Sequence, residues 1–423
     1  MECGKLLIKN GTVVCNGTST VTDILVENGI IARIADNIEA DEHTEIFDAS
    51  GSIVSYGLAD VHVHLREPGF SEKETIASGT AAAAHGGFTT VCSMPNLNPA
   101  PDSVENIAIQ QDIIDRTALI DVRPFATITK SRSGSEVVDV ESLMPHCVGF
   151  SDDGTGVQDE KTMLAAMKHI AAAGGIIAAH CEDERLLFGG YIHDGEYAAA
   201  HNHKGICSQS EWGPIARDTE LVEQSGCRYH ICHMSAAGSV EALRKAKRRG
   251  LLMTGETGPH YLTMTDMDIE ESGRFKMNPP IRSAADRAAL IEGIKDGTIE
   301  VIATDHAPHT AEQKGKGLAG SAMSVVGLET SFAVIYTKLV REGIITIEKA
   351  IELMSENPRR IFNLGGALKQ GESADIAIFD ITTPFVVSPE NFLSMGKATP
   401  FEGWELYGQC VLTLYKGNVV WKA

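Results

Sequence analysis

The chain has 423 residues, of which 43% are hydrophobic, and this length suits a large α/β barrel with an accessory module. A formal net charge of −21 argues against nucleic acid and anionic membranes as partners, because both would repel it. The nine cysteines are scattered from Cys3 to Cys410 without a C-x-x-C pair, so we expect reduced thiols in a cytoplasmic enzyme.

The N-terminal stretch predicts β structure. Residues 1–5 lead directly into a strand-like run, so no signal peptide is expected, and the apolar runs are too short for a membrane span. Asn10-Gly11 and Asn28-Gly29 are expected hairpin turns, because N-G is a strong turn signal. The expected strands are Leu6–Ile8, Thr12–Val14, Asp23–Val26 and Ile30–Ile34.

The end of the chain has the same character. Ala374–Phe379 and Val411–Tyr415 are expected strands, and Lys416–Asn418 is the expected turn before Val419–Trp421. Two β-rich ends around a different middle predict one small β-sandwich built from residues 1–56 and 366–423.

The middle, residues 57–365, alternates strand and helix patterns. This alternation predicts an α/β fold, a parallel (β/α)8 TIM barrel. The expected strands are Leu58–Val63, Thr89–Met94, Val122–Ile128, Cys147–Phe150, Gly175–Ala179, Arg228–Cys232, Leu251–Gly255 and Glu300–Ala303. The expected helices include Ser103–Ala118, Lys161–Ala173, Ile215–Gln224, Ser239–Arg249 and Ala284–Asp296.

Polar residues follow the expected barrel strands where chemistry occurs in such barrels, at the C-terminal ends. His62 and His64 end the first strand, and residues i and i+2 of a strand point to the same side, so both imidazoles can face one metal ion. The other strand-end residues are Asp152, Asp153, His180, His233, Asp305 and His309.

Each of these signals is weak alone, because a single histidine is more often structural than a ligand. His201-Asn202-His203 has the same H-x-H spacing but lies in a loop-like stretch, and we interpret it as a non-ligand. The prediction rests on five barrel positions that carry His or Asp at one end. Four His and two Asp suit zinc, or cobalt or manganese, and exceed one tetrahedral ion, so two metal ions per subunit are expected.

Several longer motifs resemble class I dihydroorotases of the cyclic amidohydrolase superfamily, and the resemblance spans the chain. They are D-V-H-V-H-L-R-E-P-G at 60–69, S-M-P-N at 93–96, R-Y-H-I-C-H-M-S at 228–235, M-N-P-P-I-R at 277–282, T-D-H-A-P-H at 304–309 and V-G-L-E-T at 326–330. The resemblance implies the reversible cyclisation of N-carbamoyl-L-aspartate to L-dihydroorotate in pyrimidine biosynthesis.

The resemblance also implies roles for single residues. His62, His64 and Asp305 would hold one zinc ion and His180 and His233 the other, with Asp305 also transferring the proton in catalysis. Asp153 would bridge the two ions in place of the carboxylated lysine of related amidohydrolases. Asp152 is the competing choice, because sequence fixes the register inside a loop poorly.

Substrate contacts are implied as well. Arg66 would clamp the substrate carboxylate, with His64, Asn96, Asn278 and His309 around it. Structural roles are the alternative for both asparagines: Asn96 fits a turn residue after Pro95, and Asn278 fits a cap before Pro279. Met323 and Ser324 stand where related enzymes often carry Phe-Gly, so only backbone contacts are expected there. The loop Thr310–Ser324 is interpreted as a mobile lid or a solvated loop.

Two other functions share part of this pattern. An allantoinase or hydantoinase would share the metal chemistry, but its substrate lacks a carboxylate for Arg66. A catalytically inactive scaffold homologue would be expected to have lost metal ligands, and all six positions are filled. The resemblance further implies a homodimer and association with aspartate transcarbamoylase.

Overall fold

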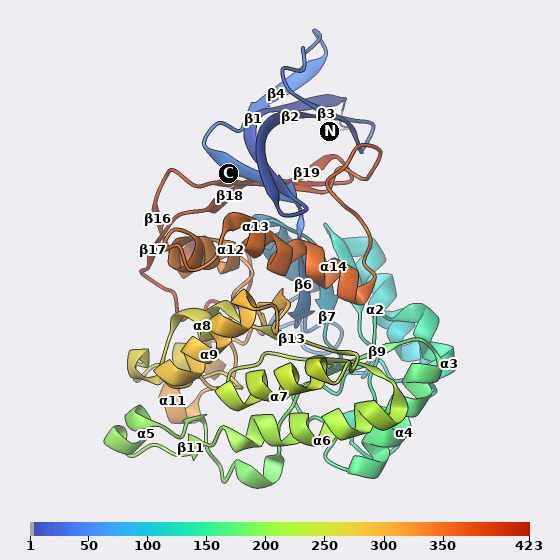
Figure 1. The fold of residues 1–423 in the computed structure, drawn as a ribbon, viewed down its shortest axis with the longest axis vertical. Coiled ribbons are helices and arrows are strands. Elements are labelled where there is room, and N and C mark those ends of the chain that lie inside the picture. The colour runs from blue at the N-terminus through green and yellow to red at the C-terminus, as the bar shows by residue number, and fades with distance from the viewer. Residues whose placement is uncertain (1–3) are drawn as a thin grey trace.

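The computed structural model describes residues 4–423, so Cys3 and the first two residues lie outside it. A sheet made by both ends of the chain sits on one end of a barrel (Figure 1). The described cysteines are all free thiols. No helix among residues 4–423 combines the length and apolar character of a membrane span.

The terminal sheet has eight strands in the order β19-β18-β15-β5-β1-β2-β3, with β4 added beside β1. They are β1 (Lys5–Cys15), β2 (Thr18–Glu27), β3 (Ile30–Ala35), β4 (Thr44–Asp48), β5 (Ser52–Tyr56), β15 (Ile376–Asp380), β18 (Gln409–Tyr415) and β19 (Asn418–Lys422). β1 pairs with β4 along its first half and with β5 along its second. One buried cluster therefore joins side chains from both ends of the chain, such as Ile24 and Ile378.

The prediction of a hairpin turn at Asn10-Gly11 is wrong. β1 runs through both residues with a register shift, and the hairpin turn to β2 lies at Asn16-Gly17. Asn10 adopts a left-handed conformation (φ 62°), and its N–H donates to Asp23 Oδ1. These are features of a β-bulge, which the same dipeptide can form. The turn expected at Asn28-Gly29 does join β2 to β3.

The barrel strands are parallel and occupy seven of the eight expected places. They are β6 (Leu58–Val63), β7 (Phe88–Ser93), β8 (Asp121–Pro124), β9 (Ile176–Ala179), β12 (Arg228–Ile231), β13 (Met253–Thr257) and β14 (Val301–Ile302). The expected fourth strand, Cys147–Phe150, is not a regular strand. It joins its neighbours through bridges from Phe150 to Ala126 and Ile177. Closure of the barrel comes from a bond from His64 N–H to His306 O (2.8 Å).

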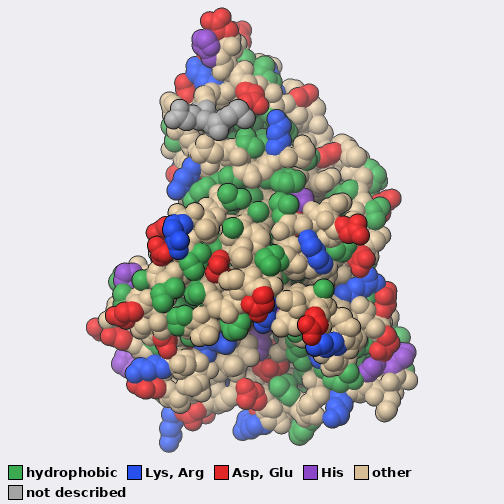
Figure 2. Space-filling view, turned by 180° about the vertical axis from the view of Figure 1, so that it is seen from behind, with side chains coloured by type: hydrophobic (Ala, Val, Ile, Leu, Met, Phe, Trp, Pro, Cys, Tyr) green, Lys and Arg blue, Asp and Glu red, His purple; other side chains and the backbone are tan. Residues whose placement is uncertain are grey.

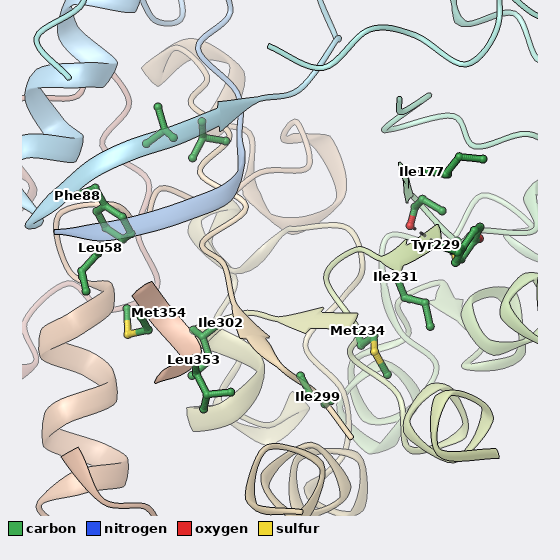
Figure 3. Packing of buried hydrophobic residues seen from close by; sticks show 14 of the residues in the cluster. Leu58, Phe88, Ile177, Tyr229, Ile231, Met234, Ile299, Ile302, Leu353 and Met354 are labelled. Atoms are coloured by element: carbon green, nitrogen blue, oxygen red, sulfur yellow. Dashed lines mark hydrogen bonds between the residues drawn. The ribbon is translucent and has the colours of Figure 1, made fainter. Parts of the chain in front are cut away.

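Helices cover the outside of the barrel, as the alternating pattern predicts. The main ones are α1 (Ile76–His85), α2 (Val104–Thr117), α4 (Glu160–Ala172), α6 (Gln209–Ser225), α7 (Ala237–Arg248) and α9 (Ala284–Lys295). Between them and the strands lies the largest apolar cluster, which includes Leu58, Phe88 and Tyr229 (Figure 3).

A second group of helices connects the barrel to the sheet. It comprises α12 (Ser331–Ile335), η6 (Tyr336–Val340), α13 (Ile347–Ile351), η7 (Glu352–Glu356) and α14 (Asn357–Phe362). The short elements in the loops are α3 (Val140–Leu143), α5 (Glu196–His201), α8 (Pro259–Thr263), α10 (Ala311–Lys314), α11 (Gly317–Gly320), β10 (Ile192–His193), β11 (Gly205–Ile206), β16 (Phe385–Val386) and β17 (Glu405–Leu406).

The segment between β15 and β18 leaves the terminal sheet and returns to the barrel. Phe401 and Leu406 of this segment are buried with Met264 and Val325. Backbone N–H groups of residues 393–395 donate to the side chains of Glu329 and Glu74. Residues 382–407 therefore pack on the barrel loops and not within the terminal sheet.

The C-terminal end of α1 is a close contact between barrel and sheet. Thr413 Oγ1 donates to Ala84 O (2.7 Å), and the His85 and Trp421 rings lie 4.2 Å apart. Gly87 has a φ of 86°, and a Cβ there would lie 2.5 Å from Phe379 Cζ. On the face shown in Figure 2, hydrophobic side chains gather in the upper half of the molecule, and acidic and basic side chains are interspersed below them.

Replacing Gly87 with alanine is expected to destabilise the protein through both strain and collision. Gly174→Ala is the matched control, since its φ is 73° and nothing lies within 4 Å of the added Cβ. The left-handed backbone alone costs about 1–2 kcal/mol, and we expect Gly87→Ala to lose about 1–3 kcal/mol beyond the control. Urea unfolding measures the difference, and equal losses in the two variants would contradict this packing.

Candidate metal centre and substrate cavity

Loops at the C-terminal ends of the barrel strands bring the six expected metal ligands together. His62 lies within β6 and His64 follows it, Asp153 follows the Phe150 bridge, His180 follows β9, His233 follows β12 and Asp305 follows β14. All six are buried, and none is more than 7% exposed.

Two buried clusters of potential ligand atoms share one carboxylate. One contains His62 and His64 and the other contains His180 and His233, and Asp153 belongs to both. Asp153 Oδ1 lies 3.5 Å from His62 Nε2 and 3.6 Å from His180 Nδ1. Asp305 Oδ1 extends the first cluster, at 3.4 Å from His62 Nε2 and 3.2 Å from His64 Nε2. A shared carboxylate between two clusters is the arrangement of a binuclear metal site.

The donor atoms fit metal ions. His62 Nε2 and Asp153 Oδ1 are buried and have no hydrogen-bond partner among residues 4–423. Because an unpaired buried polar atom is costly, these two atoms require a ligand in the space between them. His180 Nδ1 and His233 Nε2 lie 2.9 Å apart, so they too require a proton or cation between them.

Asp153 and His64 are already in the protonation states that a cation needs. Burial would raise the pKa of Asp153, but His62, His180 and His233 hold it well below its usual range. Burial, with Arg66 nearby, lowers the pKa of His64 to about 4, so its imidazole is neutral. Metal ions need a deprotonated carboxylate and a neutral imidazole. Burial would lower the pKa of His62 and of His180, but nearby carboxylates raise that of His180 to about 10 and that of His62 well above its usual value, so a metal ion there displaces a proton.

Asp152 and Asp153, the two candidates for the carboxylate between the metal ions, have different surroundings in the structure. Asp152 Oδ1 accepts the N–H groups of Ile128 (2.8 Å) and Thr129 (3.2 Å), so it is used in holding its loop. Asp153 points its carboxylate at the histidines instead. His201 and His203 lie elsewhere: His201 is the last residue of α5 and not part of a loop, and His203 Nε2 lies 2.5 Å from Glu271 Oε1.

Three of the strand-end residues have left-handed backbones. Their φ values are 61° for Arg66, 36° for His233 and 50° for Asp305. Non-glycine residues rarely adopt this conformation, and strain of this kind concentrates at functional sites.

A cavity of about 230 Å³ adjoins the clusters. All the expected substrate residues line it: His64, Arg66, Asn96, Asn278, His309, Met323 and Ser324. Asn96 Nδ2 donates to Asp153 O (2.8 Å), and its Oδ1 has no partner in the described chain. A larger groove of about 940 Å³ lies at the opposite ends of the strands, where Asp121 pairs with Arg123 (2.8 Å).

Sequence reasoning missed the groups behind the ligands. Glu256 of β13 accepts from His62 Nδ1 (2.7 Å) and lies 3.1 Å from His230 Nε2. His62, Glu256 and Cys232 also form a third potential metal cluster. However, burial raises the pKa of the Cys232 thiol, and Glu256 uses the nitrogen of His62 that faces away from Asp153. The available signal was a carboxylate directly after the expected strand Leu251–Gly255, at the end of a barrel strand where chemistry occurs.

A closed barrel with two His clusters sharing one carboxylate defines the cyclic amidohydrolase class. The solved structure of an L-hydantoinase (dihydropyrimidinase) from Arthrobacter aurescens is similar, with a TM-score of 0.89, 27% identity, and 99% and 96% of the two chains covered. The solved structure of a dihydropyrimidinase from Brevibacillus agri has a TM-score of 0.86 and is 22% identical, with 99% of this chain and 95% of that chain covered. This likeness shows the fold alone.

Comparison of sequences identifies the family within this class. Residues 51–239 match the family described as Dihydro-orotase-like. A dihydroorotase of Bacillus cytotoxicus is 48% identical and one of Bacillus thuringiensis 47%, each over 98% of both chains. The chain therefore belongs to the dihydroorotase family, and it is a hydrolase of cyclic amides.

Replacing Glu256 with glutamine is expected to weaken metal binding while the fold is retained. A carboxylate behind a metal-bound histidine fixes the ring and raises its basicity, and its loss typically costs about 10–100-fold in metal affinity. Competition with a chelator, read by elemental analysis, measures the affinity. The control is Glu292→Gln on α9, where the side chain is 63% exposed. Equal affinities in the two variants would argue against this role.

Proposed function

We propose that the 230 Å³ cavity binds L-dihydroorotate and N-carbamoyl-L-aspartate, and that the site interconverts them in pyrimidine biosynthesis. The observation that carries this assignment is Arg66. Its residue is 8% exposed, and Nε donates to Pro308 O (3.1 Å). Within the described chain its guanidinium forms no ion pair, although it lines the cavity. A buried, unpaired guanidinium favours an anionic ligand, and a carboxylate can bind it in a bidentate manner.

The same residue argues against a hydantoinase-type substrate. Hydantoins and dihydropyrimidines have the cyclic amide but no carboxylate, so they would leave the Arg66 charge uncompensated. The close structural likeness to hydantoinases reflects the shared barrel fold. An inactive scaffold is also disfavoured, because all six expected ligands converge.

We propose zinc as the metal in both positions, held by His62, His64 and Asp305 and by His180 and His233, with Asp153 between them. Imidazole and carboxylate donors suit zinc, and the orphaned His62 Nε2 and Asp153 Oδ1 support this ligand set. Bound zinc would polarise the amide carbonyl and lower the pKa of water.

Asp305 is the proposed proton carrier. Burial would raise its pKa, but His62, His64 and His233 lower it, so it is a carboxylate at neutral pH. In hydrolysis Asp305 accepts the proton of the attacking water and delivers it to the leaving ring nitrogen. In the synthetic direction it removes a proton from the carbamoyl nitrogen.

The remaining cavity residues position the ring. Asn96 Oδ1 and Asn278 Oδ1 are unpaired acceptors within the described chain, which suits substrate N–H groups. Burial, with Arg66 next, lowers the pKa of His309 to about 3, and His309 Nδ1 donates to Gln313 Oε1 (2.9 Å). His309 therefore enters the site as a neutral ring with Nε2 available. At Met323 and Ser324 the proposed contacts come from the backbone.

The division into a barrel of residues 57–365 and a sheet of 1–56 with 366–423 is also a proposal, with residues 382–407 assigned to the barrel surface on the basis of their packing. The homodimer, the association with aspartate transcarbamoylase and the cytoplasmic location stay predictions.

Asp305→Asn is expected to lower kcat/KM by about 10²–10⁴-fold, because a positioned acid–base group typically contributes that much. A spectrophotometric assay with dihydroorotate measures the loss, and circular dichroism checks the fold. Asp296→Asn, at the C-terminal cap of α9, is the control. An Asp305→Asn variant with near-native turnover would exclude the proposed role.

Arg66→Gln is expected to raise KM for dihydroorotate about 10–100-fold, since a charge-assisted hydrogen bond contributes about 1.5–3 kcal/mol. Dihydrouracil, which lacks the carboxylate, should be unaffected and serves as an internal control. Lys73→Met, which removes a cation near Arg66 without touching the cavity, tests for long-range charge effects. Wild-type enzyme that prefers dihydrouracil, hydantoin or allantoin would overturn the substrate assignment.

A further inference from the structure

Lys314 is a buried cation in the loop that the sequence left open as a lid or a solvated loop. The residue is 7% exposed and ends the short helix α10. Its Nζ donates to three backbone carbonyls, those of Lys276, Ala322 and Ser324, each at 2.9 Å. Within the described chain it forms no ion pair. The neighbouring Lys316 is different, because its side chain is 52% exposed and 3.6 Å from Glu312.

The three acceptors match the chemistry of an ammonium group, which has three N–H donors and no acceptor. Burial, with Lys276 nearby, lowers the pKa of Lys314 to about 7, so the position disfavours the charged form. A cation is retained in such a place only where its hydrogen bonds are satisfied, and here carbonyl oxygens satisfy all three.

The carbonyls belong to the two segments that form one wall of the cavity. Asn278 is two residues from Lys276, and Met323 lies between Ala322 and Ser324. Ser324 N–H also donates to Lys276 O (2.9 Å), so the two segments are bonded to each other as well as to Lys314. Lys276 Nζ adds a bond to Ala319 O (2.8 Å).

The bond to Ala322 has a directional consequence. In a trans peptide the carbonyl and the following N–H point in opposite directions. Holding Ala322 O on Lys314 therefore turns the Met323 N–H away from Lys314. That N–H forms no hydrogen bond within residues 4–423, and Met323 lines the cavity.

We propose that Lys314 is a positioning residue for substrate binding, which fixes the Met323–Ser324 backbone against the Asn278 segment so that the Met323 N–H stays available to the substrate. The inference rests on the proposed substrate site. Lys314 itself does not line the cavity, so it acts through this backbone and touches no reacting atom. The loop is accordingly a fixed part of the cavity wall and not a mobile lid.

The test compares Lys314→Met, which keeps the side-chain length but removes all three donors, with Lys316→Met in the same loop. Loss of a backbone contact that the substrate makes equally in the ground and transition states raises KM and leaves kcat unchanged. We expect KM for dihydroorotate to rise about tenfold or more in Lys314→Met, the size expected from one hydrogen bond, with kcat changed less than about threefold. Lys316→Met should match wild type, and metal content should be equal in all three proteins.

Hydrogen exchange supplies a readout independent of activity. Amides of residues 310–324 should exchange faster in Lys314→Met, while those of the barrel strands keep their protection. If Lys314→Met is insoluble, Lys314→Gln, which keeps two donors without the charge, takes its place with the same expected direction.

Unchanged KM and unchanged exchange in a folded Lys314 variant would overturn the inference. So would a lowered melting temperature with unchanged KM, which is the result expected of a purely structural lysine. Wild-type protein that is loaded with metal but inactive on dihydroorotate would instead refute the proposed function, which separates the two failures.

Discussion

Four imidazoles and two carboxylates occupy one space from which water is largely removed, and the rest of the structure depends on keeping them there. Removing such groups from water is costly unless they are paired or bind metal. The barrel meets this requirement by ending strands from five places around its circumference at one end. Glu256 then holds His62 from behind, and backbone N–H groups of Ile128 and Thr129 hold the loop that carries Asp153.

The second constraint is charge. A chain with a net charge of −21 must bind an anionic substrate, so positive charge has to be local and close. Arg66 provides it without a carboxylate partner of its own, and Lys314 lies near enough to contribute to the lowered pKa of His309. Backbone carbonyls hold both side chains in place, and neither has a carboxylate partner within the described chain.

The sequence predicts the parts of the molecule that follow periodic or local rules. Strand and helix alternation locates most barrel elements, and polar residues at strand ends locate the metal ligands, because the direction of a parallel strand fixes which end each one occupies. Strand pairing and contacts between distant segments cannot be predicted from local sequence. Asn10-Gly11 and Asn16-Gly17 carry the same turn signal, and only pairing with β2 decides between them. Cys147–Phe150 has strand composition, but its β-bridges to both neighbours are made at Phe150. The roles of Glu256 and Lys314 can be recognised only in the fold, where segments distant in sequence contact them.

The return of residues 382–407 to the barrel has a consequence for how the protein can be divided. Ser394 Oγ, from this segment, hydrogen-bonds Glu74 and lies 3.4 Å from His306 Nε2, and His306 is the neighbour of Asp305. The catalytic half is thus completed by a stretch of chain that belongs, in sequence order, to the terminal half. A gene trimmed to the barrel alone would lack the side chain that hydrogen-bonds Glu74 beside His306, behind its own active site. Recombination between relatives would therefore have to exchange both ends of the chain together with this returning segment.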